Sequence, residues 1–308
     1  MDLQSFALSL LQTALKSPED AHASLIENGT PIEQLRPLVR SMEVPHRQLS
    51  TSPMEHVISR TLGELINIYR EKTNDDSDPL HLSMNYSRIF NLVRAMQQIR
   101  PSGTVLEVGS LAGAFALTLQ RLGYQVTVVD RYDLMPDVYQ TNIAVMRQAG
   151  IRVVSTSPET EEEKIASLGM FDFVISMAVV EHIPHTPRLF LDMLKKGVRP
   201  GGWLLLDTPN LTWYWNRQKF RDGESVNAPI EQQFHSEIPF TGHHREYTGA
   251  EMLYMLKATG LDNTFVRYFD YNCLQYDWLG EDHVEYLWTI IDQPEQAGII
   301  LAGGQRTS

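Results

Sequence analysis

A glycine-rich turn between an apolar strand and an apolar helix constrains this 308-residue chain more than any other feature. The segment spans residues 104–119, and its turn contains Gly109, Ser110 and Gly113. Glycines let a ligand approach the backbone closely, and the helix that follows presents free N–H groups in its first turn. One acid, Glu107, comes just before the turn. We therefore predict that these four residues bind a ligand.

A second strand follows this helix and also ends in an acid. The apolar run at residues 125–129 leads into Asp130 and Arg131. In a βαβ unit, an acid at the end of the second strand can bind both ribose hydroxyls of a nucleotide. The spacing E-x-G-x-x-x-G in the first turn differs from the G-x-G-x-x-G fingerprint of dinucleotide sites. The two strand ends therefore indicate a nucleotide-containing cofactor that is bound differently from a dinucleotide.

The pattern of two hydrophobic residues followed by E-x-G-x-x-x-G resembles the first motif of class I S-adenosylmethionine (SAM)-dependent methyltransferases. Three later segments resemble further motifs of that family in the same order, at residues 171–183, 198–210 and 242–253. The resemblance covers residues 82–305. It implies SAM as the cofactor and S-adenosylhomocysteine (SAH) as its product. Within it, Glu107 is expected to attract the SAM ammonium group, with Asp130, Arg131 and Met177 as further cofactor contacts.

Short apolar segments alternate with helical ones through most of the chain, which is typical of a parallel, doubly wound α/β sheet. The resemblance implies the seven-stranded, Rossmann-like methyltransferase sheet, in which the last strand runs antiparallel beside the sixth. We predict strands at residues 104–108, 125–129, 151–155, 171–176, 203–207, 263–270 and 298–302.

The N-terminal part of the chain has a different character. Apolar residues recur there at helical spacing, near residues 3–15 and 58–69, and a polar linker with turn-forming residues follows. We therefore predict a helical N-terminal domain at residues 1–78 and a methyltransferase domain at residues 79–308. These helices can cover the active site, pair two subunits into a homo-oligomer, or complete the fold. The sequence leaves these three roles open.

The segment between the fifth strand and the next long helix, residues 209–247, is too long for a simple connection in a compact domain. We predict that it is a substrate lid, with Trp213, Arg217, Arg245 and Tyr247 as candidate contacts to the methyl acceptor. Aromatic rings beside hydrogen-bonding groups can stack on a sugar or an aromatic ring. They can equally form a small core under the loop.

Histidines supply the candidate catalytic groups. Methyl transfer needs the acceptor and the methyl group to be held in close alignment, and a hydroxyl acceptor must also lose its proton. Histidine titrates near neutral pH and can take that proton. The candidates are His182 after the fourth strand, and His243 and His244 before the late helix. Each of them can instead close its loop by hydrogen bonding.

A metal site is the alternative use of the first of these histidines. Quinone-type O-methyltransferases, which this chain resembles, carry Glu-x-x-Glu-His after the fourth strand and can bind a divalent cation. Here the pattern ends in Glu181-His182, but Ala178 stands in place of the first acid. Loss of an oxygen ligand weakens a site for a hard cation. We therefore expect no required metal.

Composition limits the partners. The formal net charge is −12, and no segment gathers enough Lys and Arg to follow a phosphate backbone, so nucleic acid is not expected. No apolar run reaches the ~18 residues that span a bilayer, and an acid stands where a secretory signal carries basic residues. We expect a cytoplasmic protein that acts on a small molecule or a glycan. The single cysteine, Cys273, excludes an intramolecular disulfide.

The leading hypothesis is therefore a methyltransferase that moves the methyl group of SAM to a hydroxyl of a small molecule or sugar. Methylation of nitrogen or carbon stays open. A nicotinamide-dependent oxidoreductase shares the strand-turn-helix and the acid after the second strand, although the glycine spacing argues against it. A noncatalytic SAM-binding protein is the third alternative.

Overall fold

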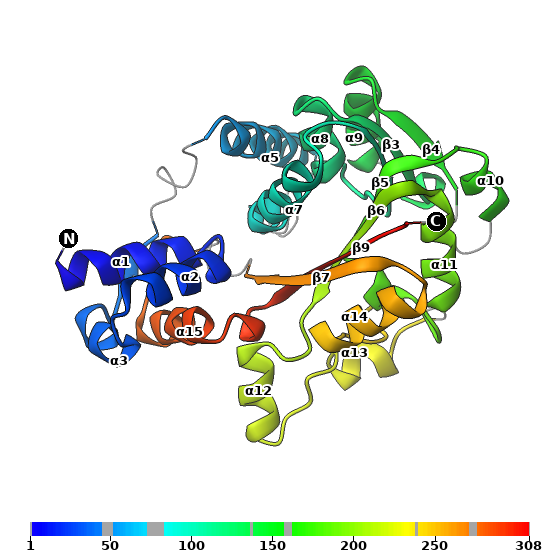
Figure 1. The fold of residues 1–308 in the computed structure, drawn as a ribbon. Coiled ribbons are helices and arrows are strands. Elements are labelled where there is room, and N and C mark those ends of the chain that lie inside the picture. Colours follow the sequence, from blue (N-terminus) through cyan, green and yellow to red (C-terminus); the bar gives the residue numbers. More distant parts are fainter. Residues whose placement is uncertain are drawn as a thin grey trace.

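A seven-stranded sheet forms the centre of the molecule (Figure 1). The structure is a computed structural model that describes residues 2–44, 52–72, 83–135, 138–156, 162–237, 240–270 and 276–307. The strands of this sheet are β2 (Thr104–Val108), β3 (Gln125–Asp130), β4 (Arg152–Ser155), β5 (Phe171–Met177), β6 (Val198–Pro209), β7 (Asp262–Phe269) and β9 (Ile299–Gln305). Their order across the sheet is β4-β3-β2-β5-β6-β9-β7.

The strands β2 to β6 run parallel to one another, and β9 inserts antiparallel between β6 and β7. The central strands are buried along most of their length, as expected for a parallel sheet that is covered on both faces. The predicted doubly wound, seven-stranded sheet is therefore confirmed. The predicted sixth and seventh strands correspond to β7 and β9, with the antiparallel direction that the resemblance implied.

Helices cover both faces of the sheet. One face of the sheet shares a hydrophobic core with α5 (Pro53–Lys72), α7 (Asn85–Ile99), α8 (Ala114–Arg121) and α9 (Val138–Gln148). The other face is covered by α10 (Glu162–Ala166), α11 (Arg188–Gly197) and α14 (Gly249–Ala258). Helix α5 belongs to the N-terminal part of the chain, yet it packs on α7, α8 and α9.

The first helices of the chain form a third core with a late helix. These elements are α1 (Leu3–Ala14), α2 (Pro18–Asn28) and α3 (Ile32–Leu35), together with α15 (Glu281–Asp292). The short strands β1 (Met42–Glu43) and β8 (Trp278–Leu279) pair beside them. Figure 1 shows α1, α2 and α3 next to α15, although they lie at opposite ends of the chain. The predicted domain boundary near residue 78 lies outside the described residues.

The two ends of the insertion at residues 209–247 lie side by side, because Asn210 and Tyr247 form an isolated bridge. It contains α12 (Tyr214–Arg221) and α13 (Ile230–Phe234). Short 3-10 helices complete the fold, namely η1 (Arg36–Leu38), η2 (Tyr132–Leu134), η3 (Val180–His182) and η5 (Pro294–Gln296). None of the described helices has the length and apolar character needed to cross a bilayer.

Candidate active site

A pocket of about 440 Å³ lies at the carboxyl ends of β2, β3, β5 and β6. Ligands of open parallel sheets bind at this edge. Four acids line the pocket, and one arginine lies among them. They are Glu107, Asp130, Glu181, Asp207 and Arg88. The acids outnumber this arginine, and a ligand that carries positive charge would favour their ionised forms.

Two glycines shape the part of the pocket that follows β2. Gly109 has φ 83° and Gly113 has φ 78°, both in the left-handed region that other residues avoid. A Cβ atom at Gly109 would collide with the Val179 side chain, and one at Gly113 would collide with Met146. Gly113 is also the N-cap of α8. The glycines therefore keep the backbone turn open and place the first turn of α8 beside the pocket.

Glu107 is the acid at the end of β2. Its side chain is 1% exposed, and its Oε2 has no hydrogen-bond partner among the described residues. Burial raises the pKa of Glu107 well above its ordinary value, and the nearby charge of Asp130 adds to this effect. A cationic group of a ligand would supply the missing partner. The residue thus fits the role expected of it toward the SAM ammonium group.

Asp130 is fixed at the end of β3 by backbone groups. Its Oδ2 accepts a hydrogen bond from the Leu111 N–H at 2.8 Å, and its Oδ1 accepts one from the Arg131 N–H at 2.7 Å. Each carboxylate oxygen can accept a further bond, so two hydroxyl groups of a ribose can be held at once. Burial raises the pKa of Asp130. A ligand that donates hydrogen bonds to the carboxylate would lower this pKa again.

Arg88 and Asp207 are pocket residues that the sequence analysis missed. Asp207, near the end of β6, is 1% exposed and accepts bonds from Arg88 Nε at 2.8 Å and from Arg88 Nη2 at 2.7 Å. It also accepts one from the Ala178 N–H at 2.7 Å. An acid at the end of an apolar strand was a visible signal for Asp207, as it was for Asp130. No local pattern pointed to Arg88.

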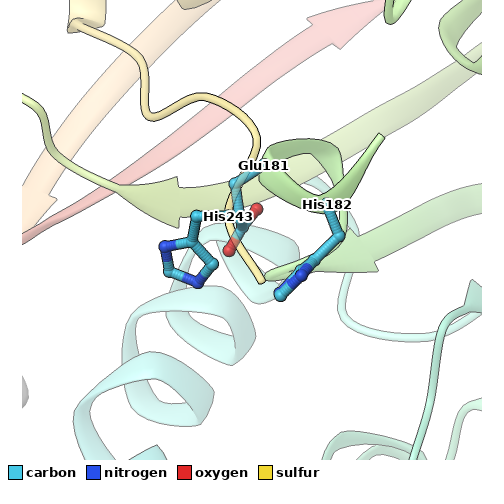
Figure 2. Close-up of side chains that lie close together, drawn as sticks. All are labelled: Glu181, His182 and His243. Atoms are coloured by element: carbon cyan, nitrogen blue, oxygen red, sulfur yellow. The ribbon is translucent and has the colours of Figure 1, made fainter. Parts of the chain in front are cut away.

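Three side chains of the pocket lie close together, as Figure 2 shows: Glu181 and His182 from η3, and His243 from the segment before α14. The Nδ1 of His182 lies 2.9 Å from the carbonyl oxygen of Thr241. A carbonyl only accepts, so this nitrogen carries the proton and Nε2 is left as an acceptor. His243 Nδ1 lies 3.1 Å from Glu246 Oε1, which leaves its Nε2 as an acceptor in the same way.

Glu181 is the most unusual residue of this group. It is 0% exposed, and both of its carboxylate oxygens lack a hydrogen-bond partner among the described residues. Its own carbonyl oxygen accepts from the His244 N–H at 2.8 Å, which ties η3 to the segment before α14. Burial and the charge of Asp207 raise the pKa of Glu181 to about 7. The sequence analysis treated Glu181 only as half of a metal motif and did not predict a catalytic role.

The two pocket histidines differ in basicity. The hydrogen bond with Glu246 raises the pKa of His243, whereas burial lowers the pKa of His182. His182 also loses basicity because His243 lies beside it, with the ring centres 4.8 Å apart. Near neutral pH, His182 therefore stays uncharged more readily than His243 does.

These three residues also have the spacing of a metal site. One possible ligand atom from each of Glu181, His182 and His243 lies within 4.8 Å of the others. The sequence argument against a metal rested on Ala178, and the structure brings His243 to the same place from a distant segment. The expectation of no required metal stays a prediction.

The remaining candidates lie outside this pocket. His244 is exposed, and its Nε2 lies 3.1 Å from the carbonyl oxygen of Phe240. Trp213 donates from Nε1 to Tyr286 on α15 at 3.0 Å. Arg217 is exposed and donates to the Thr212 carbonyl oxygen at 2.8 Å.

Arg245 and Tyr247 instead line a second cavity of about 600 Å³, between α11 and α14. Of the predicted cofactor contacts, Glu107, Gly109, Ser110, Asp130 and Met177 line the first pocket. Gly113 and Arg131 were also predicted as cofactor contacts and are not among its lining residues. The structure therefore gathers five of the seven predicted cofactor residues and two of the three histidines, and it separates them from the predicted acceptor contacts.

Comparison with known proteins gives a consistent result. Residues 84–265 match the family described as a methyltransferase domain. The ubiquinone biosynthesis O-methyltransferase of Xanthomonas axonopodis pv. citri is 31% identical over 116 residues, which cover 37% of this chain and 47% of that protein. The protein of the same name from Paramagnetospirillum magneticum is 32% identical over 139 residues, which cover 43% of this chain and 49% of that protein. The chain thus spans about half the length of these curated relatives.

Among solved structures, magnesium protoporphyrin IX methyltransferase from Synechocystis PCC 6803 with bound SAH is 14% identical, with a TM-score of 0.48, over 78% of this chain and 91% of that one. The family match covers more than half of the chain and includes the glycine turn, Asp130 and the Glu181-His182 pair. It decides for SAM over a nicotinamide dinucleotide as the cofactor, and the unpartnered Oε2 of Glu107 and the glycine turn fit that cofactor. The chain belongs to the class I SAM-dependent methyltransferase family.

Proposed function

We propose that this enzyme methylates a hydroxyl group of a small molecule. The observation that carries the proposal is the cluster of Glu181, His182 and His243 in the pocket that contains Glu107 and Asp130. The free atoms of this cluster are two ring nitrogens that accept hydrogen bonds and the carboxyl oxygens of Glu181, which accept when the group is ionised. This set suits a methyl acceptor that donates a hydrogen bond, as a hydroxyl group does.

The chemistry divides between two groups of pocket residues. SAM, when bound, supplies an electrophilic methyl group on a positively charged sulfur. Glu107 and Asp130 would hold its ammonium and ribose groups, and the glycine turn admits it to the backbone. His243 then removes the proton of the acceptor hydroxyl through Nε2, because Glu246 fixes the opposite nitrogen. The carboxyl group of Glu181 favours the protonated form of His243 that results.

The named relatives support an oxygen acceptor. The proteins from Xanthomonas and Paramagnetospirillum are both named as O-methyltransferases of ubiquinone biosynthesis. They match less than half of this chain, so the likeness supports the reaction type and not an individual substrate. A sugar hydroxyl therefore stays within the proposal.

We further propose that residues 209–247 contribute to acceptor binding, as predicted for a substrate lid. Arg245 and Tyr247 line the second cavity, and the Arg245 N–H donates to the carbonyl oxygen of Glu181 in η3 at 3.3 Å. The guanidinium carbon of Arg245 lies 5.5 Å from the centre of the Tyr247 ring. We propose that these two residues contact the part of the acceptor that lies away from the reacting hydroxyl. The division into a helical N-terminal part and a methyltransferase domain likewise stays a proposal.

The test compares neighbouring histidines. The native protein, His243→Asn and His244→Asn are each incubated with methyl-labelled SAM and a panel of hydroxylated aromatics, sugars and amines, and products are identified by mass spectrometry. We expect a methylated hydroxyl compound, a rate loss of about 10²-fold or more in His243→Asn, and a smaller change in His244→Asn. Calorimetry with SAH confirms that each variant still binds the cofactor product.

Two results would contradict the proposal. Methylation of amines alone would assign the enzyme to nitrogen acceptors. Equal rates for the native protein and His243→Asn on a hydroxyl acceptor would remove the base from the mechanism and leave positioning as the main contribution.

A further inference from the structure

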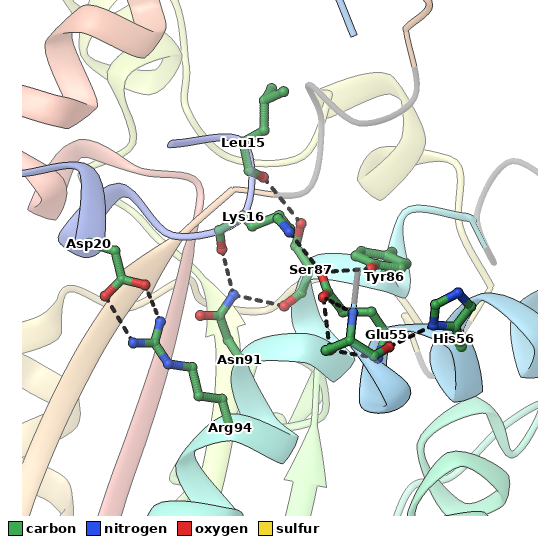
Figure 3. A network of polar contacts seen from close by, with 10 residues as sticks. Leu15, Lys16, Asp20, Glu55, His56, Tyr86, Ser87, Asn91 and Arg94 are labelled. Atoms are coloured by element: carbon green, nitrogen blue, oxygen red, sulfur yellow. Dashed lines mark hydrogen bonds and ion pairs between the residues drawn. The ribbon is translucent and has the colours of Figure 1, made fainter. Parts of the chain in front are cut away.

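We propose that the turn between α1 and α2 positions the cofactor pocket by fixing helix α7, which carries Arg88. This role differs from the three that the sequence left open for the N-terminal helices, because the helices act through α7 and not as a cover. The inference depends on the assigned cofactor and is independent of the acceptor. Figure 3 shows the contacts that join this turn and the start of α2 to α5 and α7.

Lys16, in the turn between α1 and α2, touches both α5 and α7. Its Nζ donates to Glu55 Oε1 on α5 at 2.7 Å and lies 5.5 Å from the centre of the Phe90 ring on α7. Its carbonyl oxygen accepts from Asn91 Nδ2 on α7 at 2.9 Å. The Glu55 side chain of this ion pair is only 4% exposed. Charged hydrogen bonds that water reaches poorly are the stronger ones, so this contact fixes the turn firmly.

Further contacts extend along α7. Ser87 Oγ donates to the Leu15 carbonyl oxygen at 3.5 Å, and Tyr86 OH lies 3.4 Å from Glu55 Oε1. Farther along the helix, Arg94 forms two bonds with Asp20 at the start of α2, one of them from Nη2 at 3.0 Å. The N-terminal end of α7 has no side-chain cap, so these lateral contacts hold its first turn in place.

The same turn of α7 reaches into the pocket on its other side. Asn85 and Arg88 line the pocket, and Asn85 Oδ1 accepts from Arg88 Nη1 at 2.7 Å. Arg88 in turn forms the two bonds to Asp207 described above. A planar guanidinium matches a carboxylate only in a narrow range of positions, so a small shift of α7 would disturb this pair.

Arg88 lies at the end of the pocket away from Asp130. In the sheet, β6 with Asp207 is separated from β3 with Asp130 by β2 and β5. Asp130 is the expected ribose contact, so Arg88 and Asp207 face the amino-acid end of the cofactor. The charge of Arg88 also lowers the pKa of both Glu107 and Glu181. Displacement of α7 should therefore weaken contacts to the amino-acid part and spare those to the nucleoside.

The experiment uses two probes that differ in this part, SAH and 5′-methylthioadenosine, which lacks the amino-acid group. Binding of each probe to the native protein, Lys16→Met and Lys16→Arg is measured by calorimetry. We expect Lys16→Met to weaken SAH binding by roughly threefold to tenfold. This loss is smaller than that for removal of a charge-assisted hydrogen bond, because Arg88 is displaced and not removed. Binding of 5′-methylthioadenosine should not change, and Lys16→Arg should restore SAH binding.

Arg36→Met is the matched control, because Arg36 forms an ion pair with Glu285 in the same N-terminal core but has no described contact with α7. It should leave SAH binding unchanged. Asp20→Asn is a second variant, at a half-exposed position, and it should weaken SAH binding in the same way as Lys16→Met. It keeps the inference testable if Lys16→Met does not fold. Circular dichroism shows whether each variant is folded.

Unchanged SAH binding in the folded variants would overturn the inference. Equal weakening of both probes would also overturn it, because that pattern indicates general loosening of the fold. If the native protein bound neither probe, the cofactor assignment itself would fail, and the positioning role with it.

Discussion

The buried carboxyl group of Glu181 should make the stability of the ligand-free protein depend on pH. The pKa of this group rises from an ordinary value of 4.5 to about 7 on folding. The folded protein therefore keeps the proton to a higher pH than the unfolded chain does. Below the unfolded pKa, the Glu181 carboxyl group does not change the free energy of unfolding. As the pH rises between the two pKa values the group lowers this free energy, and above the folded pKa the loss is constant. Between pH 5 and pH 8 this amounts to about 2.5 kcal/mol of lost folding free energy.

Glu181→Gln removes the titrating group and keeps its shape. The free energy of unfolding is measured by urea denaturation at pH 5 and at pH 8, with a chelator present and no cofactor. The native protein should lose about 2.5 kcal/mol more than Glu181→Gln over this interval. The difference between the two proteins removes the contributions of other groups, except for the part of the His243 shift that depends on Glu181.

A control and a refuting result complete this test. Glu251 lies in the capping box of α14, and hydrogen bonds from Thr248 lower its pKa in spite of partial burial. Glu251→Gln should therefore follow the native pH dependence in this interval, because both pKa values of Glu251 lie below it. Parallel pH profiles for the native protein and Glu181→Gln would show that Glu181 titrates normally and would refute the reasoning.

Three further predictions concern the cofactor and a metal. Asp130→Asn should weaken SAH binding in calorimetry by about tenfold or more, because an amide replaces one of the acceptor oxygens offered to the ribose hydroxyls. Gly113→Ala should cost about 1–2 kcal/mol in urea denaturation for its positive φ, plus the cost of a collision with Met146. Gly29→Ala has a similar φ of 72° in open space, so it should cost less and leave SAH binding intact. Dialysis against a chelator should not reduce methyl transfer, and restoration of a lost rate by added Zn²⁺ or Mg²⁺ would contradict the expectation of no required metal.

The sequence predicted the sheet well because its signals are local. Most of the predicted strands are short apolar runs, and the acids at Glu107 and Asp130 mark strand ends that the parallel topology brings to one edge. The direction of β9 came from the family resemblance, since no local pattern distinguishes a parallel from an antiparallel strand. The location of the pocket followed from topology alone.

The rest of the site depends on contacts between distant segments. His243 reaches Glu181 across about sixty residues of sequence only because the segment before α14 folds back onto η3. The helical spacing of Val284, Leu287, Trp288 and Ile291 is visible in the sequence, but their packing partners on α1 and α2 are not. Local patterns predict an element and its buried face, and only the tertiary structure identifies what that face covers.

The position of the family match has a consequence for the N-terminal helices. Residues 84–265 contain Arg88 and Asp207, whereas Lys16 and Glu55 lie before this region. If Lys16 holds α7 as we propose, the properties of the pocket depend partly on residues outside the part of the chain that defines the family. Changes in the turn between α1 and α2 can then alter cofactor affinity without touching any family motif. The variants Lys16→Glu and Glu55→Lys, alone and combined, test this directly. SAH affinity should fall less in the double variant than in either single variant, because the double variant restores an ion pair between the two positions.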